Sequence, residues 1–295
     1  MAIEALDRAL EIFGAPVYVY HEIVHNRPVV DEFRTKGAIF VDDIDEIPAE
    51  STVLFSAHGV APIVRKASAE RNLLAIDATC PLVTKVHLEA LRFAKEGYTI
   101  LLIGHEGHDE VIGTMGEAPK NIRLVQDLDE VAALDLPPDA KVAFLTQTTL
   151  SVDDAEVIIN GLREKYPQIV GPSKDDICYA TQNRQEAVKK LVPEADVVLV
   201  LGSQNSSNSR RLAELAISYD TPAYLIDSAD EIQEEWLQGH ETILITAGAS
   251  APEQVVEECV QYLKRRFGAT IESRTVREES VQFPLPRELR LLNSN

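Results

Sequence analysis

Six short apolar runs recur along this 295-residue chain, and each ends abruptly in small or polar residues before a helical pattern begins. The runs cover residues 17–20, 52–55, 98–103, 142–145, 197–201 and 242–245. Near-continuous apolar strands that alternate with helices are typical of parallel sheets covered on both faces. The pattern therefore predicts an α/β fold, in which ligands bind beyond the carboxyl ends of the strands.

The length of the chain predicts more than one domain, because 295 residues is at the upper limit for a single hydrophobic core. We place domain boundaries near residues 80 and 172, the second in a loop rich in Gly, Pro and Asp. Helical periodicity predicts helices over residues 2–13, 88–94, 153–166, 210–219 and 252–267. Ser151 is expected to cap the helix that follows it.

The composition excludes several classes of function. The net charge is −20, from 28 Lys and Arg against 48 Asp and Glu, whereas nucleic-acid binding needs a basic face. Any anionic ligand must therefore be held by local dipoles. No apolar run approaches the roughly 20 residues of a membrane span, and the first residues do not resemble a signal peptide. Three cysteines, a small and odd number, favour a reducing cytoplasm over a disulfide scaffold.

Two of the three cysteines lie in polar surroundings. Cys80 and Cys178 follow small, hydroxylated and acidic residues at the predicted start of an element, which suits thiolates that hold a metal cluster. Their wide separation in sequence leaves open that they are unrelated thiols. Cys259 shares helical spacing with Val255 and Leu263, so we expect it in a core.

Two polar segments that follow strands predict anion binding. Ser206, Ser207 and Asn208 lie between a strand and a helix, where hydroxyls, amides and free backbone N–H groups can hold a phosphate. Ser250 lies in a similar segment after the last strand. For both segments, simple helix capping is the alternative. Neither is followed by Gly-Lys-Ser/Thr, so nucleotide hydrolysis is not supported.

Three histidines, His25, His58 and His108, each follow a strand, and such positions converge at one edge of a parallel sheet. We expect them to share a site with the Ser and Asn segments. Glu110 is a candidate proton donor, with a solvated loop acid as the alternative. Thr148 could contact an alcohol, or its segment could cap the next helix.

Taken together, several of these motifs resemble the family of 4-hydroxy-3-methylbut-2-enyl diphosphate reductases, and the resemblance runs from Met1 to about Leu289. The motifs are residues 21–26, 56–60, 77–81, 104–108, 146–149, 176–181, 205–209 and 246–250. Eight long motifs in one order make the match specific.

The resemblance implies three α/β domains in a pseudo-threefold cloverleaf around a [4Fe–4S] cluster. It implies domains over residues 1–80, 81–172 and 173–264, with residues 265–295 returning to the first. Cys80 and Cys178 would be two of the cluster's three cysteine ligands. Glu110 would deliver protons, with the help of Thr148, which would also contact the substrate hydroxyl. The implied diphosphate ligands are His25, His58, His108, Ser206, Ser207, Asn208 and Ser250.

The implied reaction is reductive removal of the substrate hydroxyl, which yields isopentenyl and dimethylallyl diphosphate with electrons from ferredoxin or flavodoxin. One departure from the family concerns the start of the chain. The family's first cluster cysteine and opening strand lie before the position of Met1, and Cys259 is in the wrong context to replace that cysteine. We therefore expect the first sheet to lack a central strand, and residues 1–295 to be impaired. Two other classes stay open: a diphosphate-binding protein without redox activity, and a hydro-lyase with a substrate-facing cluster.

Overall fold

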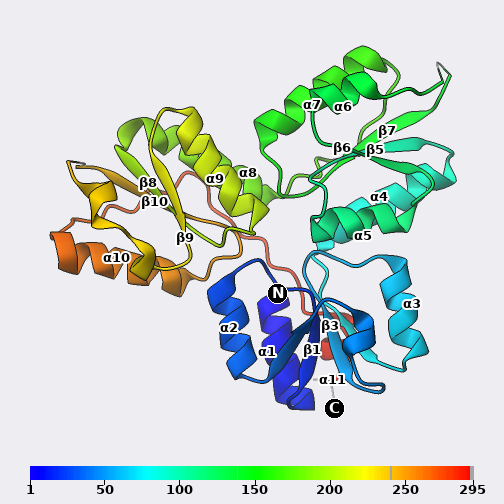
Figure 1. Ribbon diagram of the computed structural model, residues 1–295, viewed down its shortest axis with the longest axis horizontal. Helices are drawn as coiled ribbons and strands as arrows, with labels where there is room; N and C mark the ends of the chain where they lie inside the picture. Colours follow the sequence, from blue (N-terminus) through cyan, green and yellow to red (C-terminus); the bar gives the residue numbers. More distant parts are fainter. Residues whose placement is uncertain (138, 240, 293–295) are drawn as a thin grey trace.

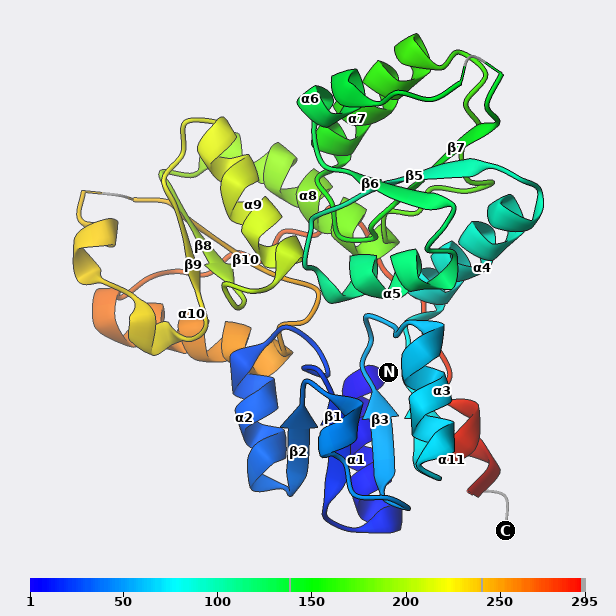
Figure 2. The same cartoon turned by 45° about the vertical axis from the view of Figure 1, so that its right-hand side comes forward.

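The computed structural model describes residues 1–137, 139–239 and 241–292 and has three lobes that meet at one central point (Figure 1). Each lobe is built on one parallel sheet with helices against it (Figure 2). This confirms the predicted α/β class and the pseudo-threefold arrangement. We call the three sheets and their helices the first, second and third units.

The first unit contains a four-stranded sheet with the order β2-β1-β3-β4. Its elements are α1 (Ala2–Phe13), β1 (Val17–Tyr20), α2 (Arg27–Thr35), β2 (Ala38–Val41), the 3₁₀ helix η1 (Ile44–Glu46), β3 (Thr52–Phe55), α3 (Pro62–Glu70) and β4 (Leu74–Asp77). The expectation of a missing central strand was wrong for the described residues, because these four strands pair consecutively without a gap. Backbone hydrogen bonding joins β1 directly to β3, which leaves no position between them.

The second unit has the sheet order β6-β5-β7. Its elements are α4 (Pro81–Lys95), β5 (Thr99–Ile103), α5 (Asp109–Glu117), β6 (Ile122–Val125), α6 (Leu128–Ala133), β7 (Val142–Thr146) and α7 (Val152–Lys165). An isolated parallel bridge between Ala143 and Val170 extends this sheet at the position that β4 takes in the first unit.

The third unit repeats the same plan with the sheet order β10-β8-β9. Its elements are α8 (Tyr179–Leu191), η2 (Val192–Glu194), β8 (Val197–Leu201), α9 (Ser207–Ser218), β9 (Ala223–Ile226), η3 (Ala229–Glu231), η4 (Glu234–Leu237), β10 (Ile243–Ala247) and α10 (Glu253–Phe267). The last helix, α11 (Arg287–Leu292), packs on α1 and β4 of the first unit. The exact domain boundaries stay a prediction.

The five helices that periodicity predicted are all present, and two of them begin several residues earlier. The helices α2, α3, α5, α6, α8 and α11 were not predicted. α4 begins at Pro81, since proline is tolerated in the first turn, and α9 begins at Ser207, directly after its cap Ser206. Ser151 caps α7 as expected, by accepting a hydrogen bond from the backbone N–H of Asp154. No helix of the described residues is long and apolar enough to cross a membrane.

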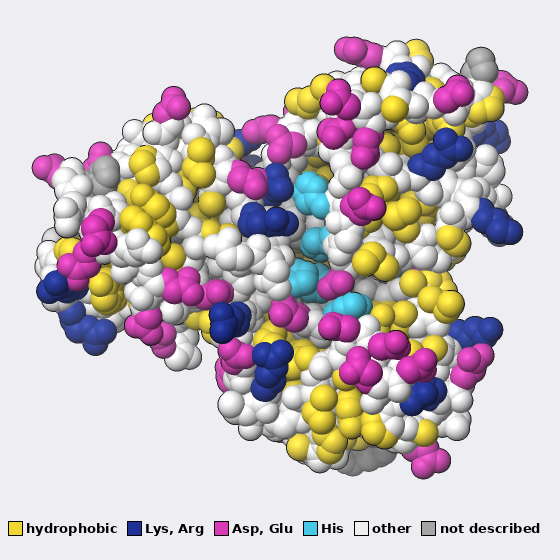
Figure 3. All heavy atoms as spheres, in the orientation of Figure 1, with side chains coloured by type: hydrophobic (Ala, Val, Ile, Leu, Met, Phe, Trp, Pro, Cys, Tyr) yellow, Lys and Arg dark blue, Asp and Glu magenta, His cyan; other side chains and the backbone are white. Residues whose placement is uncertain are grey.

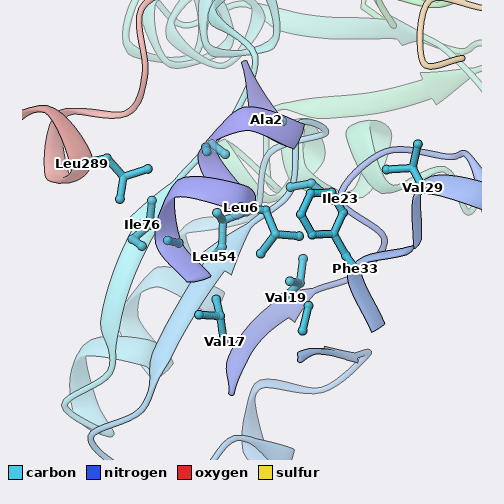
Figure 4. Packing of buried hydrophobic residues seen from close by; sticks show 14 residues of the cluster. Ala2, Leu6, Val17, Val19, Ile23, Val29, Phe33, Leu54, Ile76 and Leu289 are labelled. Atoms are coloured by element: carbon cyan, nitrogen blue, oxygen red, sulfur yellow. The ribbon is translucent and has the colours of Figure 1, made fainter. Parts of the chain in front are cut away.

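The strands β5, β7 and β8 are buried on both faces, which explains their continuous apolar runs. The strand β10 is only partly buried. In the first unit, Leu6 of α1 packs among Val19 and Leu54 of the sheet, and Leu289 of α11 closes the same cluster (Figure 4). In the third unit all five residues of β8 are fully buried. Each such side chain contributes roughly 1.5–3 kcal/mol of transfer free energy. Packing of this kind makes the three sheets rigid supports for the loops that follow their strands.

The three sheets share one topology that fixes the location of the site. In each unit the first strand is central, with the second strand on one side and the third on the other. The order therefore reverses between the first and third strands, and ligands of open α/β sheets bind at such a switch point. Loops after β1 and β3, β5 and β7, and β8 and β10 all lead to the meeting point of the lobes (Figure 1).

Candidate functional site

A cavity of about 310 Å³ lies where the three units meet, and all the predicted site residues line it. The first unit contributes His25 and His58, and Cys80 directly follows this unit. The second unit contributes His108, Glu110 and Thr148, and Cys178 follows it. The third unit contributes Ser206, Ser207, Asn208 and Ser250. Imidazole side chains are visible in the hollow between the lobes, with acidic groups beside them (Figure 3). Residues as far apart in sequence as His25 and Ser250, 225 positions, therefore line one site.

The two cysteines occupy equivalent positions. Cys80 is the N-cap of α4 and Cys178 the N-cap of α8, with backbone angles of φ −57°, ψ 132° and φ −57°, ψ 135°. The backbone N–H of Cys80 donates to the carbonyl of Ala57 at 3.0 Å, and that of Cys178 donates to the carbonyl of Thr148 at 2.8 Å. Both acceptors lie just past the third strand of their unit. The pseudo-threefold repeat thus presents both thiols to one cavity from the first turns of helices.

Burial raises the pKa of both cysteine thiols, and the charge of Cys178 adds to the effect at Cys80. Hydrogen bonds from backbone N–H groups of the first helical turns lower the pKa of both thiols. At Cys80 the donors are Leu82 and Val83, and at Cys178 they are Ala180 and Thr181. These donors would stabilise thiolates once a cation offsets the burial. Cys259, by contrast, is fully buried in the core of the third unit, where burial raises its pKa to about 11, as expected for a core thiol.

The three histidines form one cluster. The rings of His25 and His58 stack with centroids 4.1 Å apart, and the ring of His108 stands nearly perpendicular to both, at 5.5 and 5.9 Å. Burial, followed by the charges of His25 and His108, lowers the pKa of His58 well below its usual value. Burial and the charge of His25 also lower the pKa of His108 to about 3. Both rings are therefore neutral at pH 7.

The neutral state fixes the direction in which His108 donates. Its Nδ1 accepts a hydrogen bond from the backbone N–H of Glu110 at 3.2 Å, as the N-cap of α5. A neutral imidazole that accepts at one nitrogen carries its proton on the other, so Nε2–H of His108 is the donor. His58 is held through Nδ1, which lies 3.3 Å from the hydroxyl oxygen of Ser56.

Glu110 is buried rather than solvated, with 2% of its surface exposed. One carboxyl oxygen accepts from the backbone N–H of Thr148 at 2.6 Å and the other accepts from the Thr148 hydroxyl at 3.0 Å. Burial outweighs these hydrogen bonds and raises the pKa of Glu110 to about 7. The group can therefore hold or release a proton near neutral pH. Thr148 does not cap a helix, since Ser151 caps α7.

The segments of the third unit that were predicted to bind an anion combine helix capping with polar groups that face the cavity. Ser206 caps α9 by accepting from the backbone N–H of Ser209 at 3.3 Å, so the capping interpretation holds for this residue. Asn208 is 4% exposed, and both polar atoms of its amide lack a protein partner. A buried amide without partners is costly, and a ligand in the cavity would satisfy it. Ser250 does not cap α10; its hydroxyl donates to the carbonyl of His25 at 3.2 Å.

A glycine allows the loops of this unit to approach closely. A Cβ atom on Gly248 would lie 2.1 Å from the hydroxyl oxygen of Ser209, a distance too short for any side chain to fit. Substitution there would push the segment before Ser250 away from α9.

No lysine or arginine of the described residues lines the cavity, whose single carboxylate is Glu110. An anion in the cavity would therefore meet neutral imidazole, hydroxyl, amide and backbone donors. Sequence reasoning missed the apolar wall, made in part by Ile3, Val24, Val83 and Phe283. Of these, Phe283 comes from the irregular tail and had no sequence signal.

Comparison with known proteins identifies the family. The family model described as LytB protein matches residues 1–264. The chain belongs to the LytB family. Among the LytB relatives, the protein from Rhodopirellula baltica is 61% identical over 290 residues, covering 98% of this chain and 91% of the relative. The protein from Dechloromonas aromatica is 54% identical over 288 residues, covering 98% and 94%. Both are named 4-hydroxy-3-methylbut-2-enyl diphosphate reductase, which confirms the resemblance seen in the sequence.

Solved LytB structures agree with this assignment. The E-1-hydroxy-2-methyl-but-2-enyl-4-diphosphate reductase from Plasmodium falciparum is similar over 99% of this chain and 92% of its own, with a TM-score of 0.97 and 37% identity. A second structure is titled (E)-4-hydroxy-3-methyl-but-2-enyl diphosphate reductase, the terminal enzyme of the non-mevalonate pathway. It covers 90% of this chain and 93% of its own, with a TM-score of 0.64 and 30% identity.

Proposed function

We propose that this LytB protein is an iron–sulfur oxidoreductase that removes the hydroxyl group of 4-hydroxy-3-methylbut-2-enyl diphosphate. The products would be isopentenyl diphosphate and dimethylallyl diphosphate, and the step would be the last of the non-mevalonate isoprenoid pathway. The proposal rests on one observation. A carboxylic acid with a pKa of about 7, a set of hydrogen-bond donors for an anion and two thiols all face a single cavity. Its volume of about 310 Å³ suits a small allylic diphosphate.

The diphosphate would be bound by neutral donors at one end of the cavity. Nε2–H of His108 and the amide of Asn208 are positioned for this, together with His25, His58, Ser206, Ser207 and Ser250. This arrangement holds the substrate at its charged end, so that its alcohol lies toward Glu110 and Thr148.

Glu110 and Thr148 would handle the protons of the reaction. The overall change consumes two electrons and two protons, breaks one C–O bond, forms one C–H bond and releases water. With a pKa of about 7, Glu110 can be protonated at neutral pH and give that proton to the departing oxygen. The Thr148 hydroxyl, 3.0 Å from the Glu110 carboxylate, can relay a proton between the acid and the substrate.

The two cavity thiols fit an iron–sulfur cluster as two of its ligands, since each lies at a helix N-terminus where backbone N–H groups favour a thiolate. A bound [4Fe–4S] cluster would supply the two electrons, one at a time, and would receive them from ferredoxin or flavodoxin. Cys259 lies outside the cavity, so residues 1–295 supply two cavity thiols rather than three. Free thiols and such a cluster suit the cytoplasm.

The number of cavity thiols also favours a second candidate function. A chain with two cluster ligands could retain the diphosphate pocket and lose redox turnover, which would make it a diphosphate-binding protein. This candidate requires only the His, Ser and Asn donors and no metal.

The test is anaerobic reconstitution with iron and sulfide, followed by turnover with a chemical reductant and product analysis. The proposal expects iron bound per chain, consumption of reductant and formation of both five-carbon diphosphates. The E110Q variant should bind iron equally and turn over at least about 100-fold more slowly, because a proton donor contributes about 10²–10⁴-fold. Diphosphate binding without iron or turnover would favour the binding protein. Water loss without use of reductant would favour a hydro-lyase.

A further inference from the structure

Asp109 reaches across from the second unit into the histidine cluster of the first. It is the first residue of α5, and 17% of its side chain is exposed. One carboxylate oxygen lies 3.6 Å from Nδ1 of His21. The other lies 3.9 Å from Nε2 of His25 and 3.9 Å from Nδ1 of His58. A single carboxylate thus lies near three imidazoles, two of which line the cavity.

A role in the helix alone does not explain this placement. An acid in the first turn stabilises a helix by a modest interaction with its dipole. That interaction would leave the carboxylate free to point into solvent. Instead, Asp109 is largely buried and its carboxylate lies against side chains of the first unit.

His21 supports the same interpretation. Its backbone has φ 60°, a left-handed conformation that is uncommon for a residue other than glycine. Its ring lies 3.6 Å from Asp42 and 3.6 Å from Asp109. The ring of His21 therefore lies between a carboxylate of its own unit and one of the second unit.

Among the residues that the structure describes, no lysine or arginine lines the cavity to favour an anion over this carboxylate. Diphosphate oxygens and the Asp109 carboxylate seek the same imidazole N–H groups, and their charges have the same sign. Within a partly buried site, a like charge a few ångströms away lowers an affinity by roughly tenfold or more.

We propose that Asp109 acts as an internal competitor for the histidine cluster, and that it lowers the affinity of the cavity for diphosphate compounds. The inference rests on the proposed diphosphate site. Asp109 does not itself line the cavity, but its carboxylate lies 3.9 Å from the imidazoles of His25 and His58, which do, so a diphosphate bound to these rings meets its negative charge. The same repulsion assists the release of a product that carries the same diphosphate as the substrate. Asp109 is thus a residue that sets affinity rather than a proton donor.

The test is calorimetric titration of the purified chain with inorganic diphosphate, in buffer that contains EDTA so that no metal bridges the carboxylate and the anion. The D109N variant should bind diphosphate at least about tenfold more tightly than the unaltered chain. The D109A variant should also bind more tightly, which excludes a new hydrogen bond from the asparagine amide as the cause.

D42N is the matched control. Asp42 lies at the same 3.6 Å distance from His21, but its side chain is 95% exposed and is not paired with His25 or His58. Its removal changes the net charge equally and should leave the affinity within about twofold, because exposed charges are screened. Melting curves of each variant check that the fold is retained.

The outcomes separate this inference from the proposed function. Equal or weaker binding by both D109N and D109A, with binding by the unaltered chain intact, would refute the role of Asp109 and leave the diphosphate site standing. Binding by neither the unaltered chain nor the variants would reject the site itself. An equal gain from D42N would reduce the effect to net charge and overturn the specific competition.

Discussion

At the scale of single residues, burial rather than residue type decides the chemistry of the cavity. Glu110 is a glutamate whose surroundings raise its pKa to about 7, while the same burial lowers the pKa of His108 to about 3. The acid becomes available as a proton carrier, and the base becomes a neutral donor. Both effects follow from placing polar groups at the rigid ends of buried strands.

Glu110 should make stability depend on pH. Because its folded-state pKa of about 7 exceeds its ordinary value of 4.5, the folded protein retains a proton that the unfolded chain has lost. Its contribution is fully present below about pH 4.5 and is lost as pH rises through about 7. Between pH 5 and pH 8, the free energy of unfolding of E110Q should therefore rise by about 2–3 kcal/mol relative to the unaltered chain.

Urea unfolding at the two pH values measures this difference. Asp176, whose pKa burial raises to about 6, adds a slope of the same sign to both proteins, so the comparison isolates Glu110 together with its charge interaction with Asp176. E253Q removes an exposed glutamate from the first turn of α10 and should follow the unaltered chain. Parallel pH profiles for E110Q and the unaltered chain would show that Glu110 ionises normally.

At the scale of elements, α4 fixes the loop that carries the second cavity thiol. Lys85, one turn past Cys80, pairs with the fully buried carboxylate of Asp176 at 2.9 Å, and the other oxygen of Asp176 accepts from the backbone N–H of Thr146 at 3.0 Å. Lys85 also donates to the carbonyls of Lys174 and Asp175. The helix that begins at one thiol therefore holds the segment that leads to the other.

Removal of this pair should cost far more than removal of a surface pair. In K85M, the buried carboxylate of Asp176 loses its cation, and we expect a loss of about 3–5 kcal/mol in the free energy of unfolding. K189M removes an exposed ion pair, in which Nζ of Lys189 lies 2.6 Å from the carboxylate of Asp153. This change should lower the free energy of unfolding by about 0–1 kcal/mol. Urea unfolding at pH 7 compares them. If K85M lost no more free energy of unfolding than K189M, the buried carboxylate of Asp176 would not need Lys85 as its partner.

At the scale of the whole molecule, function depends on three repeats meeting at their switch points. The first and third units are joined at this point by Ser250, which donates to the carbonyl of His25, and by Asn205, which donates to Glu22 at 2.7 Å. Each unit alone offers only part of the donor set. The site therefore exists only in the assembled cloverleaf.

Iron binding should depend on the cavity thiols and not on the core thiol. After anaerobic reconstitution, C80A and C178A should each bind far less iron than the unaltered chain, whereas C259A should equal it, because Cys259 lies in the core of the third unit. Iron and sulfide analysis of each protein makes the comparison.

Retention of iron by the double variant C80A/C178A would exclude the cavity as the cluster site.

The sequence by itself determined the class of fold and the membership of the site. Continuous apolar runs such as 197–201 can only be buried on both faces, and a polar residue directly after such a run must lie at the carboxyl edge of the sheet. His25, His58, His108, Ser206 and Ser250 lie within five residues of such strand ends, so the rule places their loops at that edge. The rule does not separate them from His21 and His105, which follow the same strands and do not line the cavity. It also places Cys259 in a core, because helical spacing is a local property.

Only the tertiary structure decided what depends on contacts between units. The approach of Asp109 to three histidines, the pairing of Lys85 with Asp176 and the entry of Phe283 into the cavity join segments with no common local pattern. The pairing of β1 with β3, which showed that the first sheet has no gap between them, also depends on contacts between distant segments. Periodicity reports which face of an element is buried, but which other element covers it is settled by packing of the whole chain.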